Sequence, residues 1–302
     1  MNINNNFTPL AWHKGDIELQ SNRATYAFGH IVPLIAHYQT LIPFQIITEV
    51  DEFNISNYTM SLRKVDGTVA VASMNIPLTV AAYRMQNVVI YNGGAITDGN
   101  NNPLPIGQYY LVLTSGNNTW YSDVVTIVNS VLKMTCIEWW DEVNLEFAAG
   151  AIIYKYVGGG LTTQQYKNRM YFLEEIGMPE YTVEEEGEQR DGLFYSSKIL
   201  SGKKYKMQVA QLTEAMCDAL RFVHLSDNVQ VRDGYGRMYY CDSVLVTPEW
   251  QSGAVASASV EITTDTFVKQ VGVGFTGDSP VIEGATGIIG QGVIGDTFVI
   301  NA

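Results

Sequence analysis

The sequence predicts a mainly β chain with two successive β domains and one flanking helix, and three observations support this. Short runs of β-branched and aromatic residues follow one another from about Thr25, separated by Gly, Asn, Asp or Pro. A length of 302 residues is enough for two domains that each bury their own core. Only residues 213–223 carry a convincing helical spacing of apolar side chains.

The first domain is predicted over residues 23–130 as a β-sandwich. Asp66-Gly67 is a hairpin-type turn, and Ser115-Gly116-Asn117-Asn118 joins two later runs. Short strands that alternate with such turns are typical of a sandwich. The predicted strand runs are 45–50, 58–63, 88–91, 108–113 and 121–127.

The second domain is predicted over residues 131–270, after a boundary near 129–133. Thr213 can cap the helix, and Asp233-Gly234 is the turn of the hairpin that follows it. The acidic run 184–188, together with Arg190-Asp191-Gly192, is interpreted as a long solvated loop. Predicted strands cover 137–140, 151–156 (ended by Gly158-Gly159-Gly160), the ambiguous stretch 166–176, 243–246 (ended by Pro248) and 256–264.

Both ends of the chain are predicted to contact something else. Residues 1–22 are Asn-rich at their start and are interpreted as an arm that orders only against a partner. Residues 271–302 form an apolar, Gly-rich extension that is too apolar for water and too rich in Gly for a helix. The pattern leaves two places open for this extension: a neighbouring subunit or the chain's own sheet.

The composition favours a contact protein and argues against nucleic-acid binding. Charged residues make up only 16% of the chain, so much of the polar surface must come from Asn, Gln, Ser, Thr and Tyr. Such a surface suits subunit contacts, although an ordinary extracellular-type β domain has a similar composition. The net charge of −13 opposes phosphate binding. The one basic cluster, Lys203-Lys204-Tyr205-Lys206, is interpreted as an exposed strand edge.

No cofactor or membrane association is expected. The start of the chain lacks the features of a signal peptide, and no apolar stretch has the length of a membrane helix. The chain has three cysteines, an odd number, and their spacing is not that of a zinc site: Cys136, Cys217 and Cys241. They are interpreted as buried free thiols of a protein in a reducing cytoplasm. The four histidines also lack metal-ligand spacing and are interpreted as structural: His13, His30, His37 and His224.

No catalytic residue is predicted, because no nucleophile elbow, P-loop or dinucleotide fingerprint occurs. Glu138, Asp141 and Glu142 flank Trp139-Trp140, a combination that would suit a glycosidase if two carboxylates faced a cleft. Trp side chains in an interface beside solvated acids are the preferred interpretation. Alternating Asp98, Asn100 and Asn102 resemble a calcium loop but lack its bidentate Glu, so an ordinary turn is expected.

Two segments resemble known families. Gly107-Gln108-Tyr109-Tyr110-Leu111-Val112-Leu113 resembles the penultimate strand of an immunoglobulin-like domain. Residues 203–264 hold a strand, the short helix, a hairpin and Val246-Thr247-Pro248-Glu249-Trp250 before a closing strand. This order resembles the β-sandwich or barrel with one helix of tail-tube, distal-tail and related ring proteins of tailed bacteriophages, and the composition resembles virion proteins of Bacteroidetes or crAss-like phages.

The phage resemblance implies a structural virion subunit, made in the host cytoplasm, that forms a homo-oligomeric ring in the tail or neck. Its partners would be copies of itself and other tail or neck proteins, with no nucleic-acid sequence recognition and no membrane. The chain departs from tail-tube proteins in carrying an extra sandwich and an apolar extension, so its position along the particle stays open. The alternative is a carbohydrate-binding or adhesion module that uses exposed Trp12, Trp120 and Trp250.

Overall fold

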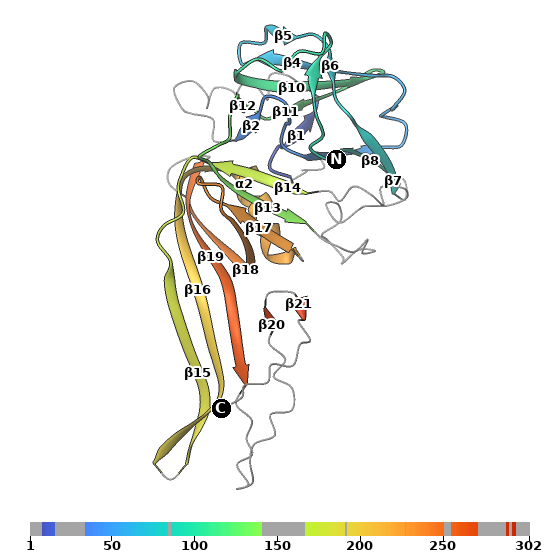
Figure 1. Cartoon of the computed structure of the whole chain (residues 1–302). Helices are drawn as coiled ribbons and strands as arrows, with labels where there is room; N and C mark the ends of the chain where they lie inside the picture. Colours follow the sequence, from blue (N-terminus) through green and yellow to red (C-terminus); the bar gives the residue numbers. More distant parts are fainter. Residues whose placement is uncertain are drawn as a thin grey trace.

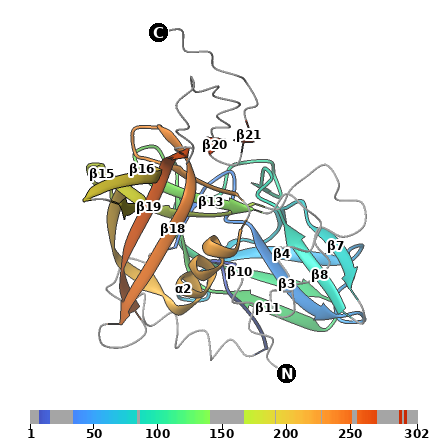
Figure 2. The same cartoon turned by 90° about the horizontal axis from the view of Figure 1, so that it is seen from below.

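The computed structural model describes residues 8–15, 34–83, 86–140, 167–190, 192–226, 228–250, 255–270, 288–289 and 292–293. Within these ranges the chain is almost entirely β, with a helix α2 (Glu214–Arg221) that continues into a 3-10 turn η2 (Phe222–Leu225). The prediction of a mainly β chain with one flanking helix is confirmed. The strands form a sandwich and a second, curved sheet, part of which projects away from the sandwich (Figure 1, Figure 2).

The sandwich is built around β10, which pairs with β4 along one edge and with β11 and β12 along the other. β1 extends this sheet next to β11, and β2 pairs in parallel with β12. A smaller sheet of β3, β8 and β7 lies in the same domain, and β6 pairs with β9. The strands are β1 (Trp12–Lys14), β2 (Ile35–His37), β3 (Phe44–Glu49), β4 (Tyr58–Lys64), β5 (Val69–Val71), β6 (Met74–Asn75), β7 (Thr79–Tyr83), β8 (Gln86–Tyr91), β9 (Thr97–Asp98), β10 (Gly107–Ser115), β11 (Asn118–Ser122) and β12 (Val125–Val128).

Part of the predicted N-terminal arm belongs to this sandwich. Trp12 in β1 is buried, and its ring centroid lies 4.8 Å from that of Phe44. The neighbouring Leu10 and Ala11 are buried as well. Residues 8–15 are therefore ordered by the chain's own core, because burial of a large aromatic side chain stabilises this contact. The rest of the predicted arm lies outside the described residues.

The second sheet has the strand order β14-β13-β17-β18-β19-β16-β15. Helix α2 buries Met216, Ala219 and Leu220, and these residues belong to one apolar core that is continuous with the core of the sandwich. The strands are β13 (Thr135–Trp140), β14 (Asn168–Phe172), β15 (Glu180–Arg190), β16 (Leu193–Thr213), β17 (Asn228–Arg232), β18 (Met238–Trp250) and β19 (Val255–Gln270). The predicted run at 166–176 thus contains the strand β14, and the predicted run at 151–156 and Gly158-Gly159-Gly160 lie outside the described residues.

Three details of the predicted second domain are wrong. The acidic run 184–188 is not a loop but part of β15, which forms a long hairpin with β16. A strand tolerates these charges because this part of the hairpin is exposed to water. The lysine cluster lies on β16, which pairs with β15 and β19 and is therefore not an edge. Pro248 does not end its strand: β18 continues through it to Trp250 and pairs there only with β19, and a strand with one open side tolerates proline.

The N-cap of α2 gives a first testable prediction. Thr213 Oγ1 accepts a hydrogen bond from the Met216 backbone N–H at 3.3 Å. Thr213→Ala should lower the free energy of unfolding by about 1 kcal/mol, because this amide then loses its partner. Urea denaturation checks this, with Thr213→Ser as the control that keeps the hydroxyl. Equal losses in both variants would contradict a capping role.

Candidate functional site

Within the described residues, one part of the second sheet projects from the molecule: the β15–β16 hairpin and the adjoining end of β19, called the projecting sheet below (Figure 1). Nearer the core, Tyr205, Met207 and Val209 of β16 alternate on the inner face and are buried against the apolar core. Because side chains alternate along a strand, Lys203 and Ser201 continue the same face outward. The projecting sheet is therefore a direct extension of the core-forming face.

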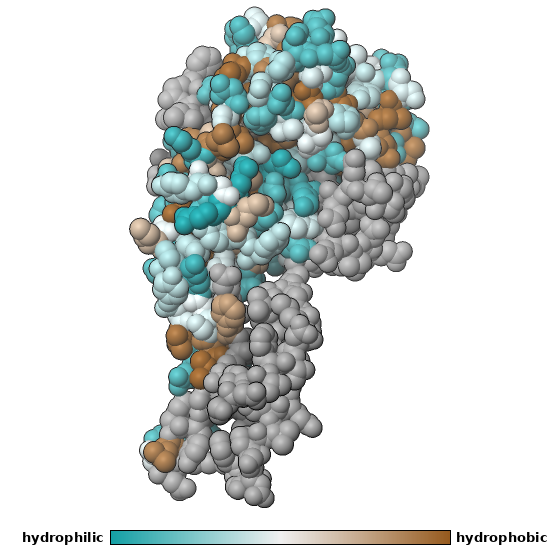
Figure 3. Space-filling view, viewed as in Figure 1, coloured by the Kyte–Doolittle hydropathy of each residue, from teal (hydrophilic) through white to brown (hydrophobic). Residues whose placement is uncertain are grey.

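Beyond the core, this inner face carries exposed apolar side chains. The pairing register places Tyr181 opposite Lys203, and Val183 opposite Ser201, which in turn lies opposite Phe267. Tyr181 is 75% exposed, Val183 66% and Phe267 51%. Figure 3 shows hydrophobic residues at several places along the described part of the projection. These three residues are called the inner apolar patch below. Exposed apolar side chains grouped on one face mark a contact surface.

The outer face of the same sheet is polar. Lys206 Nζ lies 3.0 Å from Glu180 Oε2, and Lys198 Nζ lies 3.3 Å from Glu186 Oε1. The hydrogen bond to Glu180, with the attraction of its charge, raises the pKa of Lys206 above its ordinary value. Such exposed pairs add little to stability. The outer face thus carries ion pairs, whereas the inner face carries the inner apolar patch, with Lys203 between Tyr181 and Tyr205.

The outer strand β15 is an edge of the sheet and is strongly acidic. Among the described strands, β15 pairs only with β16, so its other edge is unpaired. Five glutamates lie within it: Glu180, Glu184, Glu185, Glu186 and Glu188. Charge on an edge strand opposes edge-to-edge pairing between copies. Contact through the inner face is therefore favoured over contact through this edge.

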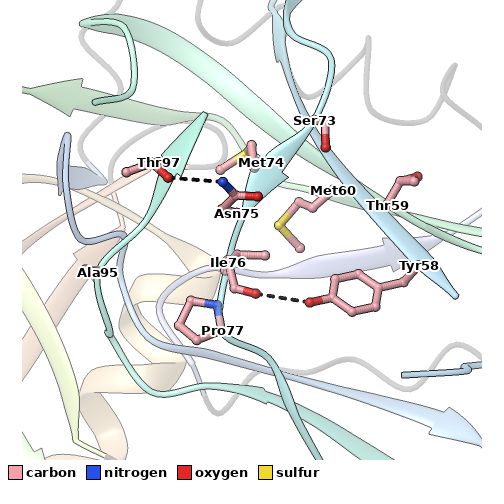
Figure 4. Close-up of a pocket in the computed structure, with 10 residues that line it drawn as sticks. All are labelled: Tyr58, Thr59, Met60, Ser73, Met74, Asn75, Ile76, Pro77, Ala95 and Thr97. Atoms are coloured by element: carbon pink, nitrogen blue, oxygen red, sulfur yellow. Dashed lines mark hydrogen bonds between the residues drawn. The ribbon is translucent and has the colours of Figure 1, made fainter. Parts of the chain in front are cut away.

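A separate hollow lies in the sandwich, bordered by β4, β6 and the segment around β9 (Figure 4). The Tyr58 hydroxyl donates to the Ile76 carbonyl at 3.0 Å, and the Asn75 amide donates to Thr97 Oγ1 at 3.4 Å. The residues that line the hollow are Tyr58, Thr59, Met60, Ser73, Met74, Asn75, Ile76, Pro77, Ala95 and Thr97. None of these ten is a carboxylate, histidine, cysteine or lysine. The hollow therefore offers neither a general acid–base pair nor a set of metal ligands.

The calcium-like sequence at Asp98 forms a hydrogen-bonded turn. Asp98 Oδ1 accepts from the backbone N–H groups of Asn100 and Asn102 at 2.9 and 2.7 Å. The Asn102 amide donates to Asp98 Oδ2 at 3.2 Å. These bonds hold the pKa of Asp98 below its ordinary value, with the backbone N–H of Asn102 as the largest cause. Among the described residues, no group of three or more His, Cys, Asp or Glu is placed to hold a metal ion.

Glu138, the acid considered for glycoside hydrolysis, lies beside a half-buried arginine. Arg169 Nε is 3.4 Å from Glu138 Oε1, and the two residues face each other across the β13–β14 pair. Burial alone would lower the pKa of Arg169, but the Glu138 charge, together with Tyr171 and Cys136, outweighs it and raises that pKa. Trp139 and Trp140 are buried, so neither ring offers an open face to a sugar. Asp141 and Glu142 lie outside the described residues.

Among the described residues, the cysteines and histidines do not come together in one metal-binding group. Cys136 is buried, whereas Cys217 and Cys241 are half-buried, and all three are free thiols. Burial raises the pKa of Cys136 to about 12 and that of Cys217 to about 11, which disfavours the reactive thiolate. The structure places three of the histidines as follows: His13 Nε2 lies 3.1 Å from Asp123 Oδ1, burial lowers the pKa of His37, and His224 is exposed in η2. His30 lies outside the described residues.

The three tryptophans of the carbohydrate alternative do not form one surface. Trp12 and Trp120 are buried in the sandwich, where they cannot stack on a sugar ring. Trp250 is 52% exposed at the end of β18. Only one of the three side chains is therefore available to a ligand.

Comparison with known proteins adds no relative. No protein-family model and no curated protein sequence matches the chain. Within the described residues, no helix combines the length and hydropathy needed to cross a membrane.

The inner apolar patch was missed in the sequence, although a signal for it exists. Tyr181 and Val183 alternate with polar residues directly before the acidic run, which is a period-two pattern. Lys203, Tyr205 and Met207 continue that pattern on the partner strand. The density of glutamates hid the alternation, because charge runs usually indicate loops.

Proposed function

We propose that this chain is a structural subunit that assembles with copies of itself into a ring, and that the ring forms part of the tail or neck of a tailed-phage virion. The observation that carries the proposal is the projecting sheet, whose inner face extends the core and ends in exposed Tyr181, Val183 and Phe267. Burial of such side chains between subunits contributes about 25 cal/mol per Å² of apolar area.

A ring is favoured by the asymmetry of the molecule. The projection leaves the molecule on one side, and the sandwich lies at the opposite end (Figure 1). A contact between unlike surfaces of identical subunits forms a closed ring when the rotation between neighbours closes. The low charge content and the resemblance of residues 203–264 to phage ring proteins support the virion assignment.

The proposal predicts that a charge on the inner apolar patch weakens self-association. Val183→Asp should raise the dissociation constant between copies by about tenfold or more, because an aspartate buried without a partner costs more than about 1.4 kcal/mol. Mass photometry and light scattering over a concentration series measure this, and electron microscopy of the wild-type protein tests for rings. Because Val183 is exposed in the subunit, the variant should keep its fold, which circular dichroism checks.

The matched control is Val69→Asp on β5, at the far end of the sandwich. Val69 is 54% exposed, so the chemistry of the change is the same while the site lies away from the projection (Figure 1). This variant should associate like the wild type. A chain that stays monomeric at high concentration and is absent from virions by mass spectrometry would overturn the proposed function.

A further inference from the structure

The inner apolar patch is open to another chain. Within the described residues, the C-terminal extension forms the strands β20 (Ile288–Ile289) and β21 (Gly292–Val293), which pair with each other, and β20 contacts β19. The rest of the predicted extension lies outside the described residues. The three side chains of the patch are at least half exposed beside these strands, so a neighbouring copy can reach them.

A second group of exposed apolar side chains lies on the outer face of the second sheet, on β18. Tyr239 packs against the apolar core on the inner face, so its neighbours Met238 and Tyr240 point outward. Met238 is 58% exposed and Tyr240 is 71% exposed. These two residues are called the outer apolar patch below. The second sheet therefore carries exposed apolar side chains on both faces, at different places along the sheet.

Each patch belongs to a row of three alternate positions along a strand. In both rows an exposed carboxylate follows two exposed apolar side chains. The rows are Tyr181, Val183 and Glu185 on β15, and Met238, Tyr240 and Asp242 on β18. Since a strand rises about 3.3 Å per residue, each row is about 13 Å long. The two rows therefore match in length.

The charges at the ends of the two rows are complementary. Lys203 lies opposite the first residue of the β15 row, and Glu185 ends that row. Arg232 lies opposite the first residue of the β18 row, and Asp242 ends that row. When two copies meet with these strands antiparallel, Lys203 approaches Asp242 and Glu185 approaches Arg232. Opposite charges around an apolar contact fix its register and exclude other orientations.

We propose that the inner apolar patch of one copy packs against the outer apolar patch of the next copy, with Val183 against Tyr240 at the centre of the contact. This inference rests on the proposed function and names the surface that the ring uses. The two patches differ, so each subunit presents its inner patch to one neighbour and its outer patch to the other. A contact of this kind repeats from copy to copy, as a ring requires.

A mixture of two full-length variants tests this pairing. Val183→Asp damages the inner patch and Tyr240→Asp the outer patch, and each variant alone should raise the dissociation constant between copies by about tenfold or more. Each variant keeps the surface that the other has lost. The mixture should therefore form dimers with one copy of each variant, at a concentration at which either variant alone is monomeric. Mass photometry counts these dimers, and circular dichroism checks that both variants are folded.

The matched control mixes Val183→Asp with Phe267→Asp. Both changes add the same charge, but both fall on the inner apolar patch, so no copy in this mixture has an intact inner surface. This mixture should stay monomeric. Met238→Asp is a second variant of the outer patch and should restore dimers with Val183→Asp as Tyr240→Asp does.

The predicted register is tested by reversing one charge. Glu185→Lys should weaken association several-fold, because it places a lysine against Arg232 of the neighbouring copy. Glu184→Lys is the control, because Glu184 is the preceding residue of β15 and its side chain points to the opposite face. Equal effects of the two changes would overturn the register.

The failure of this inference differs from the failure of the proposed function. Unchanged association in both Tyr240→Asp and Met238→Asp would overturn the pairing of the patches, while self-association itself would stand. A mixture of Val183→Asp and Tyr240→Asp that stays monomeric would overturn the pairing as well. A wild-type chain that does not associate at all would remove the proposed ring and this contact together.

Discussion

Asp233→Ala is expected to lower the free energy of unfolding by about 3 kcal/mol, because a buried carboxylate with four hydrogen bonds is lost. Asp233 Oδ1 accepts from the backbone N–H groups of Tyr235 and Arg237 at 3.0 and 2.9 Å. Its Oδ2 accepts from Arg237 Nε at 2.6 Å and from the Tyr239 hydroxyl at 3.2 Å. This one side chain closes the turn between β17 and β18, and urea denaturation measures its contribution.

The matched control is Asp66→Ala. Asp66 Oδ1 also accepts from the backbone N–H and the hydroxyl of Thr68, at 2.9 and 2.6 Å, but the residue is exposed in its turn. Water can replace the lost partners there, so this variant should lose only a small fraction of what Asp233→Ala loses. Equal losses would contradict the role of burial.

The contribution of Asp233 should disappear in acid. Burial alone would raise the pKa of Asp233, but the hydrogen bonds from Arg237 and Tyr235, with the Arg237 charge, outweigh it and lower that pKa below its ordinary value. The stabilisation is therefore complete above the unfolded-state pKa, about 3.9, and is lost as pH falls through the lower folded-state pKa. The difference in unfolding free energy between wild type and Asp233→Asn should shrink below about pH 4. A constant difference across this range would contradict an ionised Asp233.

The sequence predicts local structure well where a single strong signal decides it. Thr213 before an apolar helical face predicted α2, and Asp233-Gly234 predicted the turn between β17 and β18. These features depend on neighbouring residues, which the sequence contains directly. The acidic strand β15 was not predicted, because it forms a strand only by pairing with β16. Its hydrophobic pattern is too weak to indicate this pairing or its register.

The candidate site was harder to predict for a related reason. Whether Tyr181, Val183 and Phe267 are buried or exposed depends on where the apolar core ends, which is a property of the whole fold. The prediction that Trp12 and Trp120 are exposed was wrong for the same reason. The sequence does not show whether an aromatic residue of a strand lies on the buried or on the exposed face of the sheet. The local sequence pattern shows which side chains share a face of a strand, and tertiary packing determines which of these faces is exposed to water.

Gly234→Ala is expected to cost about 2 to 3 kcal/mol through a steric clash with the connection between the two sheets. A Cβ at position 234 would lie 2.9 Å from the Lys133 carbonyl oxygen and 3.1 Å from its carbonyl carbon. These are backbone atoms and cannot rotate away, so the turn or the connection has to shift. Gly99→Ala is the control, because its Cβ would lie 3.4 Å from the nearest atom, the Ser73 carbonyl oxygen, and it should be nearly neutral. Similar losses in the two variants would rule out the clash.

The two large effects concern one turn, so their combination is informative. Asp233 fixes the turn internally, and Gly234 allows it to pack against Lys133, which follows the last strand of the sandwich. Once Gly234→Ala has displaced the turn, the carboxylate of Asp233 no longer meets its donors in the native geometry. The double variant should therefore lose less free energy than the sum of the single variants, by about 1 kcal/mol or more. Strict additivity would mean that the turn holds its shape independently of its contact with the connection, and that the second sheet is oriented by other residues.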